Sequence, residues 1–211
     1  MTRVKVCGVT RRDQAEQLAR LGVYAVGLNF VPGGRRAVAL DTARAIHSDL
    51  SGRTLLVGVF VDPDPAWVEQ VLAVCDLDVL QFHGAEQAAA CTAYGKPYIK
   101  ALAMRSPETA AEAEQAHPEA QALLLDAHVD GLAGGTGHRF DWGWWPTGLA
   151  KPLFLAGGLD PLNVGGAVEA LRPYGVDVAS GVEGEEPGVK DMGRVQQFID
   201  QVQQADAHER Q

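Results

Sequence analysis

The sequence predicts an α/β protein built as one closed barrel of eight parallel strands. Short apolar segments recur along the 211 residues, and segments with helical periodicity lie between them. Most of the short segments are apolar on both faces, as are strands of a parallel sheet that helices cover. Alternating β and α units in one domain favour a (β/α)8, or TIM, barrel. The eight predicted strands are residues 3–7, 24–30, 54–61, 79–83, 98–102, 122–126, 152–156 and 176–180.

The helices are predicted from apolar residues at helical spacing and from proline-containing starts. Val68, Val71, Leu72 and Cys75 share one helix face, and other segments repeat this pattern. A residue that can cap a helix and is followed by proline predicts a helix start. Three such pairs are Asp64-Pro65, Ser106-Pro107 and Asp160-Pro161.

The barrel is predicted to occupy residues 1–203, with a polar, frayed tail over residues 204–211. Residues 127–149 are rich in Gly and Trp and are expected to form a long loop. An open, doubly wound sheet is the structural alternative, but no G-x-G-x-x-G fingerprint follows the first strand.

Composition and charge restrict the function classes. The chain is 46% hydrophobic and has no apolar run long enough to span a membrane. Its start leads directly into a strand pattern without a secretory segment, so a cytoplasmic location is expected. The net charge of −9 repels nucleic acid phosphates. Three cysteines without C-x-x-C spacing and six scattered histidines predict neither a disulfide framework nor a metal site.

Polar and reactive residues follow the predicted strands at one end of the barrel. Cys7 and Gly8 end the first strand, Q-F-H-G (Gln81 to Gly84) ends the fourth, and Asp126 ends the sixth. In barrels of this kind, functional side chains collect where strands end and the loops to the helices begin. We therefore expect the site at this end.

Two glycine-containing loops indicate a phosphate site. A-G-G-L contains Gly157 and Gly158 after the seventh strand, and A-S-G-V-E contains Ser180 and Gly181 after the eighth. Glycines let backbone amides approach a phosphate closely, and phosphate sites are frequent after these two strands. The alternative is that these glycines only form tight turns.

The residue types leave two interpretations for each reactive side chain. A free cysteine such as Cys7 is most often a small buried hydrophobe, but at a strand tip it can serve as base or nucleophile. Asp126 follows three leucines, where a carboxylate is costly to bury unless it is paired or used. It could be a general acid or could cap the following loop.

The remaining candidate site residues could also have ordinary structural roles. Arg35 and Arg36 follow two glycines, and an arginine there could hold a carboxylate, although loop arginines are usually solvated. His83 is more often a residue that orders its neighbours than a ligand. Cys75 and Cys91, and the cluster Trp142, Trp144 and Trp145, are interpreted as packing residues, with a subunit contact as a further option for the tryptophans.

The motifs at the strand ends resemble those of phosphoribosylanthranilate isomerases. The resemblance covers nearly the whole chain, from Val4 to about Phe198, in the order of that family. Its motifs are V-K-V-C-G-V-T, V-G-V-F-V, Q-F-H-G, L-L-L-D-A, G-G-T-G-H-R-F-D-W, L-A-G-G-L-D-P-L-N-V, V-D-V-A-S-G-V-E and P-G-V-K-D.

The resemblance implies an enzyme of tryptophan biosynthesis that needs neither cofactor nor metal. It implies an Amadori rearrangement of N-(5-phosphoribosyl)anthranilate, with Cys7 as general base and Asp126 as general acid. Arg36 would hold the anthranilate carboxylate, although the family's S-x-R is here G-G-R-R and leaves Arg35 as an alternative. The implied substrate-binding residues are Arg36, Gln81, His83, Gly157, Gly158, Ser180 and Gly181.

Two other function classes remain as alternatives. One is a different phosphosugar isomerase with paired carboxylates, such as that of histidine synthesis, which would require an aspartate where Cys7 stands. The other is a non-catalytic barrel that binds phosphosugars without turnover. The partner is a small phosphosugar in each case, and both a monomer and a homodimer are compatible with the sequence.

Overall fold

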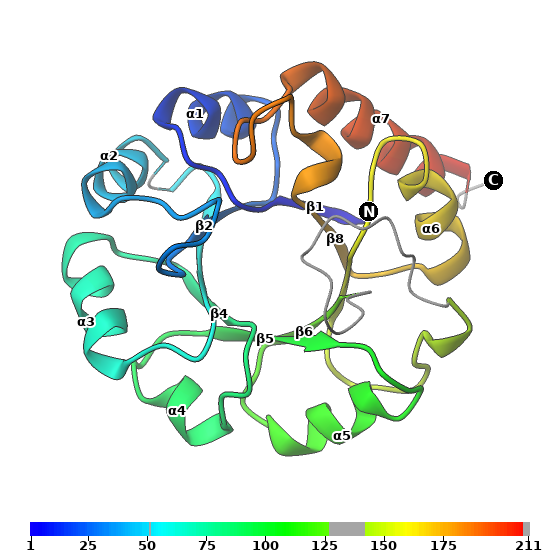
Figure 1. Cartoon of the computed structure of the whole chain (residues 1–211). Coiled ribbons are helices and arrows are strands. Elements are labelled where there is room, and N and C mark those ends of the chain that lie inside the picture. Colours follow the sequence, from blue (N-terminus) through cyan, green and yellow to red (C-terminus); the bar gives the residue numbers. More distant parts are fainter. Residues whose placement is uncertain (51, 127–141, 209–211) are drawn as a thin grey trace.

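The computed structural model describes residues 1–50, 52–126 and 142–208 and shows a closed barrel of eight parallel strands (Figure 1). The strands pair in chain order, and β8 pairs with β1 to close the barrel. This confirms the predicted fold. The strands are β1 Arg3–Val6, β2 Ala25–Asn29, β3 Leu55–Phe60, β4 Val79–Phe82, β5 Tyr98–Ala103, β6 Ala122–Asp126, β7 Leu153–Ala156 and β8 Gly175–Val178.

Helices surround the strands as an outer layer (Figure 1). Two short 3₁₀ helices, η1 Trp142–Trp144 and η2 Ser180–Val182, lie in loops after β6 and β8. The α-helices are α1 Arg12–Arg20, α2 Leu40–Leu50, α3 Pro65–Val74, α4 Ala88–Thr92, α5 Thr109–Ala116, α6 Val164–Leu171 and α7 Met192–His208.

One of the three proline-containing starts is a helix start in the structure. Asp64 caps α3 by accepting a hydrogen bond from the N–H of Ala66, with Pro65 at the first helical position. The prediction is wrong at Ser106, because α5 begins three residues later at Thr109. It is also wrong at Asp160, whose carboxylate forms a turn with the N–H groups of Leu162 and Asn163 ahead of α6.

The tail is shorter than the sequence indicates. Helix α7 continues to His208, so residues 204–208 are helical and the predicted frayed tail is wrong there. Ala205 and Asp206 are buried, and Asp206 accepts hydrogen bonds from the N–H and hydroxyl of Thr2. The end of the helix is thus held by the start of the chain. Residues 127–141 of the predicted long loop lie outside the described residues.

The core has two parts, which the alternation of side chains along each strand separates. The larger part lies between the strands and the helices. The smaller part lies inside the barrel and consists of Ile99, Ala101, Ala122, Leu124, Phe154 and Ala156. The register aligns these lumen residues across β5, β6 and β7, so every second residue of a strand points into the barrel.

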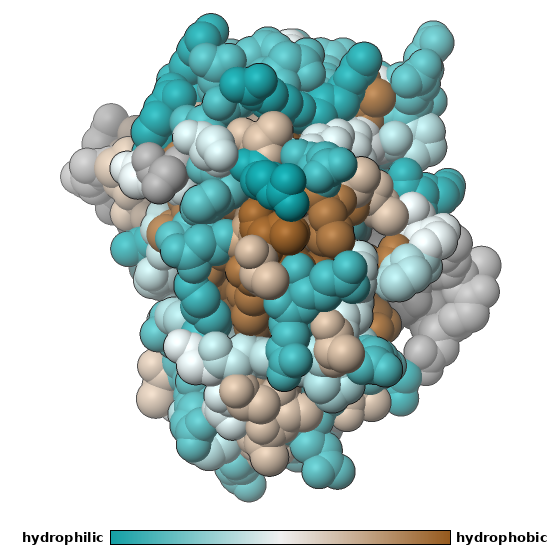
Figure 2. Space-filling view, turned by 90° about the vertical axis from the view of Figure 1, so that its left-hand side faces the viewer, coloured by the Kyte–Doolittle hydropathy of each residue, from teal (hydrophilic) through white to brown (hydrophobic). Residues whose placement is uncertain are grey.

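The outer surface includes one hydrophobic area on the side where α2 and α3 lie (Figure 2). Hydrophilic side chains surround it in that view. Among the described residues, none of the helices has the length and apolar character needed to cross a membrane.

Candidate functional site

The strand alternation brings four predicted or neighbouring polar residues to the same end of the barrel interior. Asp126 aligns with Ala156 one layer above Leu124, and Gln81 aligns with Val59 and Ile99. Cys7 follows β1 two residues after Lys5, and Asn29 ends β2. All four side chains therefore point to the inside of the barrel at the carboxyl ends of the strands, which we call the mouth.

Cys7 is buried and fixed by its neighbours. Its N–H donates to the carbonyl of Val178 at 2.8 Å, and its thiol lies 3.6 Å from Oδ1 of Asn29, which can accept its proton. Burial raises the pKa of the thiol, and the ammonium groups of Lys5 and Lys190 oppose this. The shift of the Cys7 pKa is therefore opposite to the lowering that is typical of reactive cysteines.

Asp126 is paired with His83 rather than left in an apolar pocket. Nε2 of His83 lies 3.3 Å from Oδ2 of Asp126, and the two side chains are 29% and 23% exposed. They come from β6 and from the residue after β4, with β5 between them. The carboxyl group is thus partly open to a ligand while the imidazole holds its position.

Gln81 has a buried side-chain oxygen that forms no hydrogen bond with the described residues. The side chain is only 1% exposed, and its Oε1 has no hydrogen-bond partner among the described residues. A buried amide oxygen without a partner is costly, so it is available to accept a hydrogen bond from a bound molecule.

The structure distinguishes the two loop arginines. Arg35 is exposed, whereas Arg36 is half-buried and lies over Gly8, directly after Cys7. A Cβ at Gly8 would lie 2.5 Å from Cδ of Arg36, and the φ of Gly8 is +71°. Only glycine allows this approach of the arginine stem to the tip of β1. The geometry thus favours Arg36 for a role at the mouth.

Glu183 fixes the guanidinium of Arg36. The two side chains form a bidentate pair, with Nε donating to Oε1 at 2.7 Å and Nη2 to Oε2 at 2.8 Å. Glu183 also accepts hydrogen bonds from Nζ of Lys190 and the N–H of Gly188. Burial alone would raise the pKa of Glu183, but hydrogen bonds from Arg36 and Lys190 bring it down to about 2. The loops after β2 and β8 are therefore tied together.

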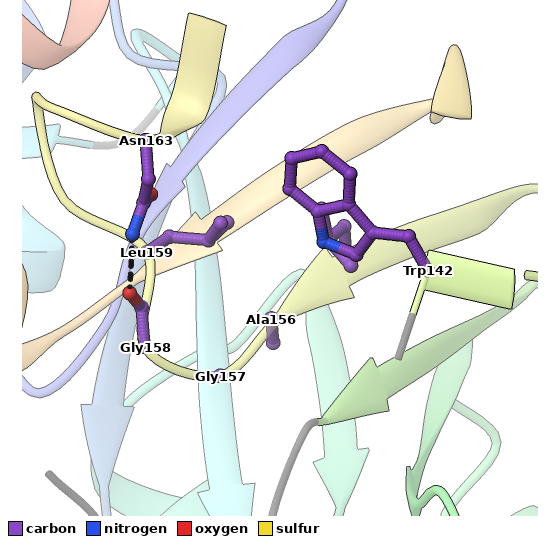
Figure 3. Close-up of a pocket in the computed structure, with 7 residues that line it drawn as sticks. Trp142, Ala156, Gly157, Gly158, Leu159 and Asn163 are labelled. Atoms are coloured by element: carbon purple, nitrogen blue, oxygen red, sulfur yellow. Dashed lines mark hydrogen bonds between the residues drawn. The ribbon is translucent and has the colours of Figure 1, made fainter. Parts of the chain in front are cut away.

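The loop after β7 lines a small pocket (Figure 3). Gly157 and Gly158 have φ values of +84° and +63°, and their N–H groups donate no hydrogen bond to another described residue. Nδ2 of Asn163 donates to the carbonyl of Gly158 at 2.8 Å, which fixes the loop. Trp142 lines the same pocket and packs against the core, in agreement with its predicted packing role.

The loop after β8 approaches the β7 loop very closely. Ser180 lies in η2 rather than in the predicted eighth strand, which ends at Val178. A Cβ at Gly181 would overlap the carbonyl oxygen of Leu159. Glycine is therefore needed for the contact between the two loops, and Gly157, Gly158, Ser180 and Gly181 are gathered on one side of the mouth.

Several residues of the site were not among the predicted ones. Lys5, Asn29, Asp177 and Lys190 surround Cys7, and Glu183 holds Arg36. The sequence did contain an indication of Lys5 and Asp177. Each is a charged residue within an otherwise apolar strand, and the two strands, β1 and β8, lie side by side once the barrel is closed. Cys75 and Cys91 are buried free thiols, in agreement with packing roles. No group of three or more His, Cys, Asp or Glu that could hold a metal lies within the part of the chain that the structure describes.

The fold and the site define a barrel enzyme with a thiol and a carboxyl group at its mouth and an amide-lined loop pair beside them. A model of the N-(5'-phosphoribosyl)anthranilate (PRA) isomerase family matches residues 4–201. The N-(5'-phosphoribosyl)anthranilate isomerase of Cellvibrio japonicus (strain Ueda107) is 45% identical over 204 residues, covering 97% of this chain and 94% of that protein. The chain belongs to this family and is an isomerase of tryptophan biosynthesis.

Solved structures agree with this assignment. Phosphoribosyl anthranilate isomerase from Thermotoga maritima superposes with a TM-score of 0.86 at 32% identity, covering 97% of this chain and 100% of that chain. A phosphoribosyl anthranilate isomerase in complex with reduced 1-(o-carboxyphenylamino)-1-deoxyribulose 5-phosphate superposes with a TM-score of 0.80 at 31% identity, covering 97% and 100%. A further structure contains monomers derived from the dimeric Thermotoga maritima enzyme, with a TM-score of 0.82 at 31% identity, again covering 97% and 100%.

Proposed function

We propose that the chain converts N-(5-phosphoribosyl)anthranilate to 1-(2-carboxyphenylamino)-1-deoxyribulose 5-phosphate with Cys7 as base and Asp126 as acid. The observation that carries this proposal is the location of both groups at the mouth, with inward-pointing side chains on β1 and β6. In the barrel, β7 and β8 separate these strands, which supports placement on different sides of one sugar ring.

The reaction needs one proton to be given and another to be taken. Protonated Asp126 gives its proton to the ring oxygen of the ribose, the C1′–O bond breaks, and a protonated imine forms. This imine acidifies C2′–H, and the thiolate of Cys7 removes that proton. The resulting enaminol gains a proton at C1′ and loses the proton of its O2′ hydroxyl, which gives the neutral ketone. Electrons move only within the substrate, so the aldose carbon is reduced while C2′ is oxidised.

The remaining residues bind and orient the substrate in this proposal. Arg36 binds the anthranilate carboxylate with the guanidinium N–H groups that Glu183 does not use. Gly157, Gly158, Ser180 and Gly181 bind the phosphate through backbone N–H groups, with the hydroxyl of Ser180 available as well.

Gln81 and His83 complete the proposed site. His83 holds the carboxyl group of Asp126, which lies 3.3 Å away. The unpaired Oε1 of Gln81 is available to accept a hydrogen bond from a ribose hydroxyl.

The test is to measure turnover of the Cys7→Ala and Asp126→Asn variants by the loss of substrate fluorescence. Each variant should lose at least about 100-fold in kcat, the lower end of what general acid–base groups contribute. Thermal unfolding should shift little, because each change removes few atoms. Cys91→Ala, which removes a buried thiol on α4, is the matched control and should retain activity. Near-normal turnover of both site variants would refute the assigned roles.

The same proposal extends to assembly and location. We infer a homodimer, since a family member from Thermotoga maritima is described as dimeric and a hydrophobic area is exposed over α2 and α3 (Figure 2). Light scattering at micromolar concentration would test it, and a monomer mass would contradict it. Three free cysteines favour the reducing cytoplasm, which fractionation with a tagged chain would test.

A further inference from the structure

Lys5 is a fully buried charged side chain that the proposed chemistry does not use. It is 0% exposed and points into the barrel from β1, two residues before Cys7. A buried ammonium is costly unless it is paired and hydrogen-bonded. Asp177, its register partner on β8, supplies the pairing, with Nζ of Lys5 donating to Oδ1 at 2.8 Å.

The ammonium of Lys5 approaches the sulfur of Cys7 through space that Gly27 leaves open. A Cβ at Gly27 would lie 2.9 Å from the sulfur and 3.2 Å from Nζ of Lys5. The two atoms are therefore within about 6 Å of each other, a range in which an opposite charge changes the stability of an ion strongly. Any other residue at this position would press a Cβ against both atoms and displace at least one of them.

Four charged groups face the thiol from the elements packed around it. Lys5 and Lys190 favour the thiolate, and Asp177 disfavours it. Arg36, from the loop after β2, interacts favourably with it. Lys190 and Arg36 both bind the single carboxylate of Glu183 in the loop after β8, whereas Lys5 points into the barrel from β1. Lys5 is thus the cation of this set that lies beneath the sulfur, inside the barrel.

We propose that Lys5 is a positioning residue whose ammonium, fixed by Asp177, stabilises the thiolate of Cys7 and so favours its action as a base. The proposal rests on the proposed role of Cys7 as base. Burial lowers the pKa of Lys5, but Asp177 and Cys7 outweigh burial and raise it. Lys5 therefore stays charged throughout the working pH range, while the thiol beside it gives up and regains one proton in each turnover.

The experiment measures the thiol directly, by the rate at which iodoacetamide alkylates Cys7 as a function of pH, quantified by peptide mass spectrometry. The main variant is Lys5→Met/Asp177→Asn, because removing Lys5 alone would leave a buried carboxylate unpaired. Its alkylation midpoint should rise by about one pH unit, because the loss of Lys5 outweighs the loss of Asp177, which disfavours the thiolate. Its kcat at pH 7 should fall at least about 10-fold with little change in KM, and activity should recover as the pH is raised.

A second variant keeps both charges. Gly27→Ala places a methyl group against both the ammonium and the sulfur and removes no charge. At least one of the two atoms must move away, so the midpoint should rise in the same direction. The control Lys96→Met/Asp76→Asn removes an ion pair that lies outside the barrel lumen and involves an exposed aspartate, and it should leave the midpoint unchanged.

The outcomes separate the two proposals. Folded Lys5→Met/Asp177→Asn protein with an unmoved midpoint would overturn the role of Lys5, as would an unmoved midpoint in Gly27→Ala if the double variant does not fold. Failure of the proposed function would be seen instead as absence of turnover in the unmodified chain, whatever the alkylation profile.

Discussion

Arg36 and Glu183 connect two loops at the barrel mouth through a bidentate, largely buried ion pair. The donor–acceptor distances are 2.7 and 2.8 Å, and the two side chains are 18% and 7% exposed. Glu183 is also bound by Lys190 and the N–H of Gly188. One carboxylate therefore determines where the guanidinium that we assign to substrate binding lies.

Glu183→Gln should impair binding more than chemistry. Gln has only one acceptor oxygen and no charge, so it cannot form the bidentate pair with Arg36 and leaves Arg36 and Lys190 without their carboxylate. We expect KM to rise at least about 10-fold with a smaller change in kcat, because Arg36 contacts the substrate away from the reacting atoms. Unfolding in urea should show a loss of about 3 kcal/mol, as when a buried pair loses one partner.

Glu185→Gln is the matched control for this change. Glu185 is an exposed glutamate in the same loop, so the same substitution there should leave KM and stability unchanged. Equal KM values for Glu183→Gln and Glu185→Gln would contradict the role assigned to Glu183.

The same carboxylate predicts how stability depends on pH. The folded-state pKa of Glu183, about 2, is below its ordinary value of 4.5. Its contribution is therefore fully present above the ordinary value and is lost as the pH falls from 4.5 toward 2. The pKa difference corresponds to about 3 kcal/mol. Urea unfolding at pH 7, 4 and 3 should show this loss in the unmodified chain and a smaller loss in Glu183→Gln. Parallel pH dependences would refute the prediction.

The sequence was sufficient to predict the barrel because the apolar strands are short, regularly spaced and separated by helical patterns. Most strand ends were placed within one or two residues, since apolar runs are bounded by polar residues and glycine. The turns at Ser106 and Asp160 were predicted as helix starts because a capping side chain and a proline also occur in a turn that precedes a helix.

The site was only partly predictable. Cys7, Asp126 and the loop glycines follow strands, so position along the chain indicates them. The partners of these residues come from distant segments: Glu183 reaches Arg36 across 147 positions, and Asp177 reaches Lys5 across 172. The spacing of residues along the sequence does not indicate such pairs. They become neighbours only because the barrel closes and brings β8 next to β1.

Gly8→Ala should test the contact between Arg36 and the tip of β1. Its Cβ would lie 2.5 Å from Cδ of Arg36 at a φ of +71°, so the arginine stem must move away from Cys7. We expect KM to rise about 10-fold and stability to fall by more than the roughly 1–2 kcal/mol that a left-handed backbone alone costs.

Gly33→Ala separates the two effects in the Gly8 variant. Gly33 has a φ of +74° and no atom near its absent Cβ, so it should show only the backbone cost and a normal KM. Identical kinetics for Gly8→Ala and Gly33→Ala would remove the evidence that Gly8 is needed for the position of Arg36.

Gly181→Ala should separate the two loops that we assign to phosphate binding. The added methyl group would overlap the backbone oxygen of Leu159, and because this neighbour is backbone, the loops after β7 and β8 must move apart. We expect a loss of about 1–3 kcal/mol, as for other overpacked sites. Inorganic phosphate should inhibit the variant less than the unmodified chain, since the backbone N–H groups of the two loops no longer point to one place.

Gly184→Ala is the matched control, because its nearest neighbour is 3.9 Å away. It should change neither stability nor phosphate inhibition. Unchanged phosphate inhibition in Gly181→Ala would contradict the assignment of these loops.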